Sequence, residues 1–371
     1  MRVQLVDPSG DVTPYDHALS AALARQGADV ELVSSRFLYG PIPEQRDYAL
    51  NELFYRRANR LGPEARRARR AVKLLEHVPD MLRYRRHARD ADVRHYQWLP
   101  IEPLDQYLVP RARPRVMAMH NVIRRGDGRR QARVTRGLAG RMDAVVVHTR
   151  HGARRLEELG VDADRIHVIP HGAFEHLTRQ DEEVPLPEEL AAVAGPVVLS
   201  FGMVRDYKGV DVLLRAFREL EDAELWIVGR PLNYSMEPLH ELAREVPAKV
   251  RFVTRYVTEP EIPAFFRRAD VLVLPYRSVD QSGVLYAGLA FGKPMVISDV
   301  GGFSEVGEEH GAARLVPPGD APALAAALRD LLSDPQERAA LGGRAATAAA
   351  GAYSWDDIAD RTLGLYGKLL R

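Results

Sequence analysis

Short apolar runs and amphipathic segments alternate along almost the whole of this 371-residue chain. Such alternation is typical of βα units that build parallel sheets. In the first half, strand candidates lie at residues 3–6, 28–33, 93–98, 115–119, 144–148 and 166–169. In the second half they lie at residues 197–201, 224–228, 250–253, 271–274, 295–297 and 313–316. We therefore predict an α/β fold made of two Rossmann-like, doubly wound domains.

An acidic, proline-containing segment at residues 178–196 separates the two sets of strands. We interpret it as a linker that leads into a short helix, and we place the domain boundary near residue 180. The predicted domains are residues 1–180 and 181–352. The tail at residues 353–371 has apolar side chains at helical spacing and is predicted to be a helix that needs a partner surface.

Composition excludes several classes of function. A formal net charge of +1 supplies no field for attracting nucleic acid, so we expect no nucleic-acid partner. The absence of cysteine excludes disulfides, zinc knuckles and thiol nucleophiles. No apolar run approaches the roughly 18 residues of a membrane span, and the N-terminus lacks a signal-peptide pattern. We therefore expect a cytoplasmic protein.

The segment at residues 271–305 predicts an anion site. A strand-like run ends in a polar turn that contains Asp280, Gln281, Ser282 and Gly283, and residues 284–291 are interpreted as an amphipathic helix. A helix start next to a glycine exposes unpaired N–H groups at the positive end of the helix dipole. Such a start favours a nucleotide or sugar phosphate over a nucleic acid or a metal.

A second segment of the same half, at residues 199–217, supplies positive charge. It predicts a strand, a turn at Gly202, cations at Arg205 and Lys208, and then a helix. A guanidinium and an ammonium on one short loop suit the neutralisation of a departing diphosphate. The alternative, two solvated loop charges, is weakened by the anion site predicted nearby.

Short motifs follow one another along the chain in a recognisable order. They are MRVQLVD at the start, AMHNV at 118–122, RIHVIPHG at 165–172, FGMVRDYKG at 201–209, LWIVGR at 225–230, AFGKPMVISDVGGFSE at 290–305, LVPPGD at 315–320 and YSWDDIADR at 353–361. In this order the chain resembles the retaining family-4 glycosyltransferases of the GT-B fold. The resemblance implies that two Rossmann-like domains face a cleft, the first offering the acceptor surface and the second holding the nucleotide sugar. It also implies that a C-terminal helix beginning near Trp355 crosses back to the first domain.

The resemblance also assigns roles to individual residues. His120 contacts a hydroxyl of the donor sugar, and Arg205 and Lys208 stabilise the leaving diphosphate; these three are the implied catalytic residues. The front-face mechanism usually proposed for this family lets the departing phosphate oxygen take the acceptor proton, so it needs no strong base. No cofactor is implied beyond a UDP- or GDP-linked sugar as co-substrate. The implied donor-binding residues are Gly10, Arg205, Lys208, Arg255, Tyr256, Gln281, Ser282, Gly283 and Glu305.

The chain departs from the family pattern at two places. Many members carry two glutamates eight positions apart, where this chain has Val279 and Ala287. The roles of those carboxylates therefore cannot be transferred, and we expect Gln281 and Ser282 to make polar contacts instead. An arginine that commonly follows the glycine of the FG turn is replaced by Met203, and Arg205 is the candidate to supply its charge.

The acceptor site is the least defined part of the prediction, and the acceptor itself is a sugar, a lipid-linked molecule or a small molecule. Asp11 and Asp16 are equally explained as a turn residue and a helix cap, and His171 as part of a turn leading into the linker. The candidate acceptor residues are Asp11, Tyr15, Asp16, Trp98 and His171.

Three alternatives remain open from the sequence. The arginine-dense stretch at residues 56–89 predicts either a solvated helix face or peripheral contact with the inner membrane face. The Asp-x-Asp triplets at 90–92 and 162–164 precede their strands, which is the wrong end for a catalytic metal, so we expect no metal site and activity that survives chelation. The missing glutamates leave room for a nucleotide-sugar binder without transfer activity, or for an epimerase that would need a carboxylate cluster.

Overall fold

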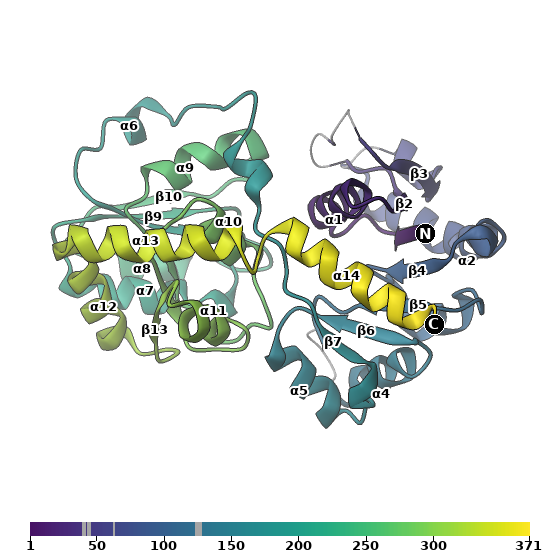
Figure 1. Cartoon of the computed structure of the whole chain (residues 1–371). Coiled ribbons are helices and arrows are strands. Elements are labelled where there is room, and N and C mark those ends of the chain that lie inside the picture. The colour runs from purple at the N-terminus through teal and green to yellow at the C-terminus, as the bar shows by residue number, and fades with distance from the viewer. Residues whose placement is uncertain (39–41, 43–45, 62–63, 123–127) are drawn as a thin grey trace. The chain divides into compact units, whose positions relative to one another are not determined.

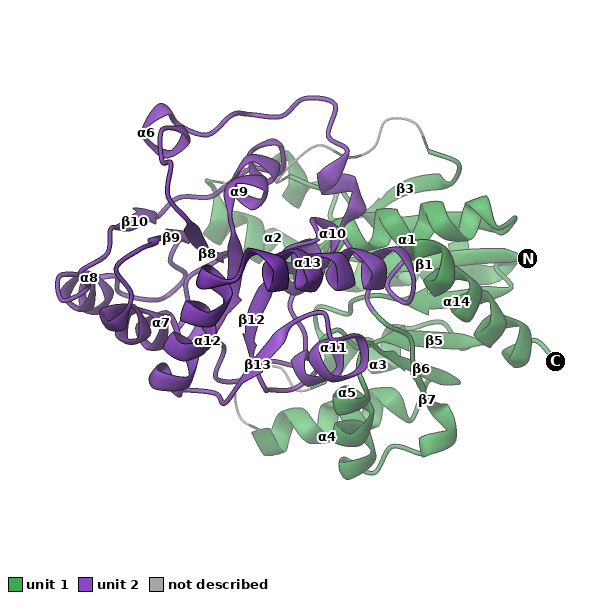
Figure 2. Ribbon diagram, turned by 60° about the vertical axis from the view of Figure 1, so that its left-hand side comes forward, with its two compact units in different colours: residues 1–170, 355–371 green, residues 171–354 purple. Residues whose placement is uncertain are grey.

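The computed structural model describes residues 1–38, 42, 46–61, 64–122 and 128–371, and the chain divides into two compact units (Figures 1 and 2). The first unit contains Met1–Pro170 and Trp355–Arg371, and the second contains His171–Ser354. The division follows Pro170 and does not lie near residue 180. The acidic segment belongs to the second unit because its short helix α6 (Glu188–Ala191) buries Leu190 in the core of that unit.

The sheet of the first unit has seven parallel strands in the order β3-β2-β1-β4-β5-β6-β7. The strands are β1 (Arg2–Asp7), β2 (Asp29–Ser35), β3 (Ala49–Phe54), β4 (Val93–Tyr96), β5 (Arg115–Ala118), β6 (Ala144–Val147) and β7 (Ile166–Val168). The helices are α1 (Thr13–Arg25), α2 (Arg66–His87), α3 (Glu102–Leu108), α4 (Gly128–Ala139), α5 (Arg150–Glu158) and α14 (Trp355–Leu369).

Strand β3 is the one described strand that the sequence reading missed. It lies at the edge of the sheet, and the first four of its residues are exposed or half-buried. An edge strand can tolerate polar residues such as Asn51 and Glu52 because one side of it faces solvent. It therefore lacks the apolar run that marks a central parallel strand.

Helix α14 is part of the first unit, where it packs beside α1 (Figure 1). Trp355, Ile358 and Tyr366 join the buried cluster that also holds Tyr15 and Leu19 of α1. Full burial of an aliphatic side chain such as Ile358 stabilises a fold by about 1.5–3 kcal/mol. The apolar spacing of the tail is thus explained by its contact with this unit.

The sheet of the second unit has six parallel strands in the order β10-β9-β8-β11-β12-β13. The strands are β8 (Val197–Phe201), β9 (Glu224–Val228), β10 (Val250–Val253), β11 (Val271–Leu274), β12 (Met295–Ser298) and β13 (Arg314–Val316). Besides α6, the helices are α7 (Val210–Ala216), α8 (Glu237–Ala243), α9 (Ile262–Arg268), α10 (Gly283–Ala290), α11 (Phe303–His310), α12 (Ala321–Ser333) and α13 (Pro335–Ala350). Two parallel sheets confirm the prediction of two Rossmann-like units.

In each sheet the strand order reverses once, between β1 and β4 in the first unit and between β8 and β11 in the second. Open α/β sheets bind ligands beyond the carboxyl ends of the strands at such a switch point. The loops that follow β1, β4, β8 and β11 are therefore the places to look for a site.

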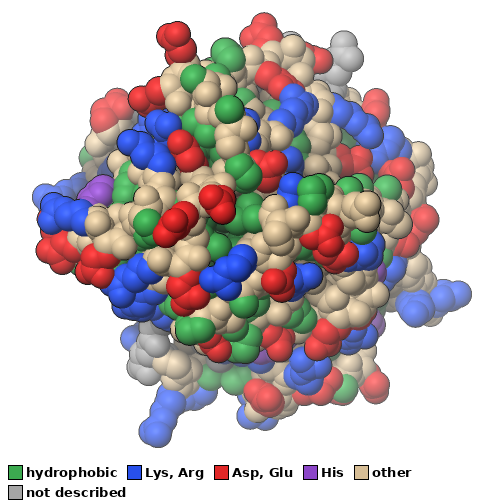
Figure 3. Space-filling view, turned by 90° about the vertical axis from the view of Figure 1, so that its left-hand side faces the viewer, with side chains coloured by type: hydrophobic (Ala, Val, Ile, Leu, Met, Phe, Trp, Pro, Cys, Tyr) green, Lys and Arg blue, Asp and Glu red, His purple; other side chains and the backbone are tan. Residues whose placement is uncertain are grey.

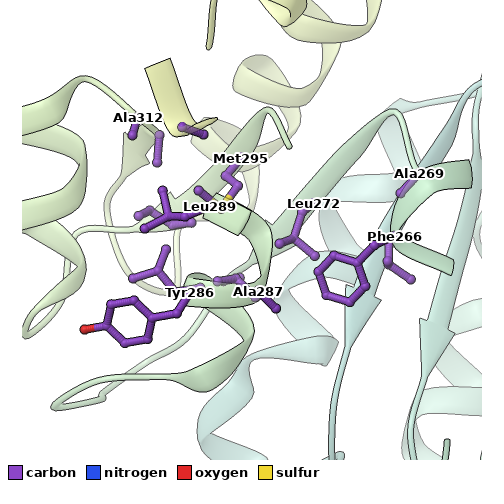
Figure 4. Packing of buried hydrophobic residues seen from close by; sticks show 14 of the residues in the cluster. Phe266, Ala269, Leu272, Tyr286, Ala287, Leu289, Met295 and Ala312 are labelled. Carbon is purple, nitrogen blue, oxygen red and sulfur yellow. The ribbon is translucent and has the colours of Figure 1, made fainter. Parts of the chain in front are cut away.

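Helix α10 is buried along most of its length, which corrects the prediction of an amphipathic helix. Residues 285–289 are all buried, and Tyr286, Ala287 and Leu289 pack with Leu272 and Met295 in one apolar cluster (Figure 4). A helix that is apolar on every side lies inside a core, because it has no polar face to turn toward water.

The surface drawn in Figure 3 mixes acidic and basic side chains, with small hydrophobic areas between them. This mixture agrees with a formal net charge of +1. Among the described helices, none is both long and apolar enough to cross a membrane.

Candidate functional site

The switch point of the second unit brings Lys208 and the start of α10 together around Gly202. Gly202 has a φ of +97°, and a Cβ there would lie 2.9 Å from Lys208 Nζ and 3.1 Å from Val284 Cγ2. A side chain at this position would therefore clash with both groups. Glycine allows the Lys208 ammonium and the first turn of α10 to share the space beyond β8.

A second chain of contacts links the same two elements. Lys208 Nζ lies 5.1 Å from the centre of the Tyr276 ring, and Tyr276 Oη lies 3.3 Å from Ser282 Oγ. Ser282 is the N-cap residue of α10, but its side chain does not cap the helix. The first N–H groups of a helix have no partner within the helix. The ammonium and these N–H groups together favour a bound anion.

Arg205 stands on the same loop, just before the short 3-10 helix η5 (Asp206–Lys208). Its Nε is buried and donates to no acceptor in the described part of the chain. Leaving a buried donor without a partner costs about 1–3 kcal/mol. Neither Arg205 nor Lys208 forms an ion pair with a described residue, so both cations are available to a ligand.

The loop that carries these cations is held by Arg277, which the sequence reading did not single out. The Arg277 guanidinium binds both Asp211 carboxylate oxygens at 2.6 and 2.7 Å and the Asp206 carbonyl at 2.7 Å, while its backbone N–H donates to the Tyr207 carbonyl at 2.7 Å. Burial alone would raise the pKa of Asp211, but the hydrogen bonds and charge of Arg277 outweigh it and lower that pKa. The ion pair therefore persists at neutral pH.

The other predicted donor residues lie at the same edge of the sheet or on neighbouring helices. Arg255 and Tyr256 follow β10, and Arg255 is engaged by Glu261 at 2.6 Å. Glu305 lies in the first turn of α11, after β12. Gln281 directly precedes the N-cap residue of α10 and is half-buried.

The two positions where the family pattern has glutamate lie in apolar surroundings. Ala287 is buried in the core cluster, and Val279 is partly buried against it. Met203, at the position of the missing arginine, is 41% exposed.

The switch point of the first unit gathers aromatic and histidine side chains. His120 follows β5 and lies 4.8 Å from Tyr15 in a T-shaped contact and 6.4 Å from Trp98, measured between ring centres. The structure therefore brings together three predicted site residues. His148, which follows β6, joins them at 4.7 Å from the His120 ring centre. The sequence analysis did not identify His148 as a site residue, although its position at the end of a predicted strand indicated such a role.

The hydrogen bonds of His148 determine the proton positions on His120. His148 Nδ1 lies 3.0 Å from the Ile169 carbonyl, which can only accept, so Nδ1 carries a proton. Burial lowers the pKa of His148 to about 4, so its Nε2 is unprotonated at neutral pH. That atom lies 3.1 Å from His120 Nδ1, which must therefore be the donor. The proton of the contact between the two histidines therefore lies on His120 Nδ1.

The Gly10 loop after β1 is organised by Asp7. The Asp7 carboxylate accepts hydrogen bonds from the N–H groups of Ser9, Gly10 and Val12 at 3.0, 3.0 and 3.2 Å. The Gly10 N–H is thus engaged within the loop. Asp11 is exposed and accepts from Ser9 Oγ at 2.8 Å, as expected for a turn residue.

Asp16 does not cap α1, contrary to one of the two interpretations of this residue. Val12 is the N-cap residue, and Asp16 is buried in the first turn. Burial and the nearby Asp7 charge raise the pKa of Asp16. Both Asp16 carboxyl oxygens are buried and have no hydrogen-bond partner in the described part of the chain, so the protonated form is favoured there.

His171 belongs to the second unit, whereas the other candidate acceptor residues belong to the first. Its ring stacks on Tyr286 of α10 with centres 4.4 Å apart, and its Nδ1 lies 2.7 Å from the Gly172 carbonyl. It therefore supports the helix of the anion site.

One aspartate of each Asp-x-Asp triplet has a local role. Asp92 accepts from the Arg2 N–H at 2.7 Å, and Asp162 caps a short 3-10 helix. Across residues 1–38, 42, 46–61, 64–122 and 128–371, no group of three or more His, Asp or Glu is placed to hold a metal.

The buried His148 predicts loss of stability in mild acid. The pKa of His148 falls from 6.5 to about 4 on folding. Between these pH values the unfolded chain binds a proton at this residue and the folded chain does not. Stability therefore decreases as pH falls from 6.5 to 4, by about 3 kcal/mol from this group. His148→Asn removes the titration, and urea unfolding across this window should show a shallower decrease. His17 is shifted in the same direction in both proteins, and Asp7 and Asp16 act in the opposite direction in both. Burial still lowers the pKa of His95 in the variant, which loses only the smaller contribution of the His148 charge and so adds to the shallower decrease. An unchanged pH dependence in the variant would contradict the assignment.

Two family models match the two halves of the chain. The model described as Glycosyltransferase Family 4 matches residues 15–173, and the model described as Glycosyl transferases group 1 matches residues 195–334. Among curated proteins, the D-inositol 3-phosphate glycosyltransferase of Nocardia farcinica is 32% identical over 240 residues, which is 62% of this chain and 53% of that protein. The GDP-mannose:glycolipid 4-beta-D-mannosyltransferase of Xanthomonas campestris pv. campestris is 36% identical over 132 residues, 35% of this chain and 36% of that protein. The chain thus matches about half, or less, of the length of these relatives.

Solved glycosyltransferase structures share the fold over the full length. Sucrose-phosphate synthase from Thermosynechococcus elongatus gives a TM-score of 0.74 at 20% identity, covering 100% of this chain and 99% of that one. Anabaena HepE in complex with UDP-glucose gives 0.75 at 18% identity, with 100% of both chains covered. With both halves matched by glycosyltransferase models and both sheets shared with these structures, the chain carries a Glycosyltransferase Family 4 domain and a Glycosyl transferases group 1 domain in a GT-B fold.

Proposed function

We propose that this protein transfers a hexose from a nucleoside diphosphate sugar to an acceptor hydroxyl, with retention of anomeric configuration and without a metal ion. The second unit holds the donor diphosphate, and the first unit supplies the acceptor-binding residues. A transferase that uses a nucleotide sugar is what the matched families have in common. The retention, the metal independence and the roles of single residues are the proposed parts.

The observation that carries the proposal is the packing of Lys208 Nζ and the first turn of α10 around Gly202. It places a positive side chain beside the positive end of a helix, at the switch point where open α/β sheets bind ligands. A diphosphate develops negative charge as the sugar leaves it. Fixed positive groups stabilise that charge without having to reorganise during the reaction.

The proposed reaction breaks the bond between the anomeric carbon and the diphosphate oxygen. The acceptor oxygen forms the new bond on the same face, and its proton passes to the departing phosphate oxygen. Lys208 and Arg205 stabilise the diphosphate, and His120 contacts a sugar hydroxyl. Positioning of the two substrates supplies much of the rate.

The names of the relatives suggest which substrates to test. One relative is named for a GDP-mannose donor and a glycolipid acceptor, others for an inositol phosphate acceptor, and HepE was solved with UDP-glucose. We propose a UDP- or GDP-linked hexose as donor and a polyol phosphate or glycolipid as acceptor. A glycolipid acceptor would bring the protein to the inner membrane face. Thermal shift with UDP, GDP, ADP and their sugars should identify the base, since a ligand that binds only the folded state raises its stability.

Product stereochemistry and chelation test the reaction itself. Proton NMR of the product should show the anomeric configuration of the donor sugar, and the rate should be unchanged in excess EDTA. An inverted product would overturn the front-face mechanism. Complete loss of transfer in EDTA, restored by manganese, would overturn the metal independence.

A binder without transfer activity is the second candidate, because Val279 and Ala287 stand where the family has glutamates. Incubation with radiolabelled donor separates the two readings. Transfer or slow donor hydrolysis supports the enzyme, and tight binding without turnover supports the binder. Interconversion of the free donor sugar would instead indicate an epimerase.

Arg277 is predicted to position the cationic loop without touching the donor. Arg277→Ala should lower kcat about tenfold or more, because a small displacement of Lys208 weakens charge stabilisation in the transition state. Arg277→Lys keeps the charge but lacks the planar fork that binds Asp211 through one nitrogen and the Asp206 carbonyl through the other, so only part of the rate should return. Thermal shift checks that both variants fold. A variant with lower stability but normal kcat would show that Arg277 is only structural.

A further inference from the structure

The outward side of α2 presents apolar side chains to solvent. Leu75 is 77% exposed, Leu82 42% and Val78 37%, and their spacing of three, four and seven residues places them along one side of the helix. The opposite side is buried through Met81 and Tyr84. We call Leu75, Val78 and Leu82 the apolar stripe of α2. One exposed leucine is ordinary, but three in line on a helix that is already packed call for an explanation.

Helix α2 as a whole is strongly positive. The helix contains eight Lys or Arg residues and two acids, Glu76 and Asp80, a formal charge of +6. Both acids are used within the unit, since they accept hydrogen bonds from the backbone N–H groups of residues 55, 57 and 58. Asp80 also pairs with Arg83. Neither acid is thus an exposed counter-charge for Arg85 and Arg86 at the C-terminal end of the helix.

A groove lined by four arginines continues the apolar stripe at the C-terminal end of α2. It has a volume of about 370 Å³ and is lined by Leu82, Arg85, Arg86, Ala88, Arg89, Pro110, Arg111 and Ala112. No acid is among the described residues that line it, and none of the four arginines forms an ion pair within the described ranges of the chain. Leu82 belongs to both the stripe and the groove. The chain thus joins an apolar surface to an uncompensated anion-binding groove.

We propose that the apolar stripe and the arginine groove dock the first unit on an anionic lipid bilayer, with a lipid phosphate in the groove. Leucine side chains on a basic helix enter the boundary between head groups and acyl chains. Arginine binds phosphate through paired N–H groups. A second copy of the chain fits less well, because a two-fold contact through this face would bring the same unpaired arginines toward each other.

The proposed docking depends on the proposed function only for its purpose, because the docking would bring the enzyme to a glycolipid acceptor in the bilayer. Binding to vesicles is measured without a donor or an acceptor. Failure to bind would therefore leave the transfer reaction standing, and failure of transfer would leave the docking standing.

Co-sedimentation with vesicles tests the proposal. The full chain should bind vesicles of equal parts phosphatidylglycerol and phosphatidylcholine, and should bind phosphatidylcholine vesicles weakly. Each basic residue near an anionic surface contributes about 1 kcal/mol, so the double variant Arg85→Gln and Arg111→Gln should lose roughly 30-fold in affinity. The double variant Leu75→Ser and Leu82→Ser should lose at least about tenfold in affinity. The binding that remains is electrostatic, so it should decrease more steeply with salt than the binding of the original chain. These side chains are exposed or line an open groove, and thermal shift confirms that the variants fold.

A matched control removes the same charge elsewhere. Arg154 and Arg244 are exposed and form no ion pair with a described residue, so Arg154→Gln with Arg244→Gln should bind like the original chain. An equal loss in this control would show general charge attraction and overturn the docking site. Equal binding to both kinds of vesicle would overturn it too. It would also fail if the chain were a dimer in solution that Leu75→Ser with Leu82→Ser converted to monomers.

Discussion

Replacing Lys208 with methionine should lower kcat for sugar transfer about a hundredfold to a thousandfold, the usual effect of removing one fixed group that stabilises transition-state charge. The ammonium lies beside Gly202 and the first turn of α10. The leaving diphosphate is proposed to bind at this place. Methionine keeps most of the side-chain length and its contact with the Tyr276 ring. Because Lys208 forms no ion pair with a described residue, the melting temperature should hardly change. Initial rates and thermal unfolding measure the two effects separately.

Lys249→Met is the matched control. Lys249 is an exposed lysine of the same unit, at the opposite end of the sheet just before β10. The control loses the same charge far from the proposed diphosphate, so its kcat should equal that of the original chain. Wild-type transfer by the Lys208→Met protein would end the assignment of Lys208. An equal loss in both variants would indicate a general effect of charge.

Gly301→Ala should give the largest loss of stability among single methyl additions in the second unit. Gly301 has a φ of +56°, and a Cβ there would lie 1.7 Å from the Val279 carbonyl oxygen. Strain in the left-handed region costs about 1–3 kcal/mol, and the clash forces the Val279–Asp280 backbone to move. A loss of at least about 2 kcal/mol is expected, measured by urea unfolding.

The same change should weaken donor binding. The Gly302 N–H donates to the Asp280 carbonyl at 3.1 Å, so the turn after β12 supports the loop that leads into α10. Gly343→Ala is the control, because Gly343 lies in α13 with nothing within 4 Å of the added Cβ. That variant should gain about 0.5–1 kcal/mol, since alanine is the better helix former. Normal stability in Gly301→Ala would mean that the loop can adjust and would refute the argument.

The sequence predicted central parallel strands well because they are buried on both faces and read as continuous apolar runs. It also predicted the order of strand, polar turn and helix start in residues 271–283, because these are local features. The edge strand β3 was missed because its side chains are partly polar. Helix α10 was misjudged because short apolar segments have the same composition whether they lie at a surface or in a core.

Contacts between distant residues lay beyond any local pattern. Arg277 and Asp211 are separated by three strands in sequence, and nothing in either segment shows that one guanidinium holds the cationic loop. His148 and His120 lie in separate motifs, and the proton positions on His120 follow only from their 3.1 Å contact. The arginine groove likewise combines the end of α2 with residues 110–112.

By itself the sequence determined the two Rossmann-like units, the family resemblance and the segments that carry the cations and the helix start. These follow from hydrophobic periodicity, glycine placement and motif order, all of which are local properties of the chain. Only the tertiary structure decided which of these groups meet. Lys208 lies beside α10 over a turn whose positive φ favours glycine, and the strand order of the sheet brings β8 next to β11. A parallel sheet joins strands that are remote in sequence, so the geometry of its switch point is fixed by the packing of the whole unit.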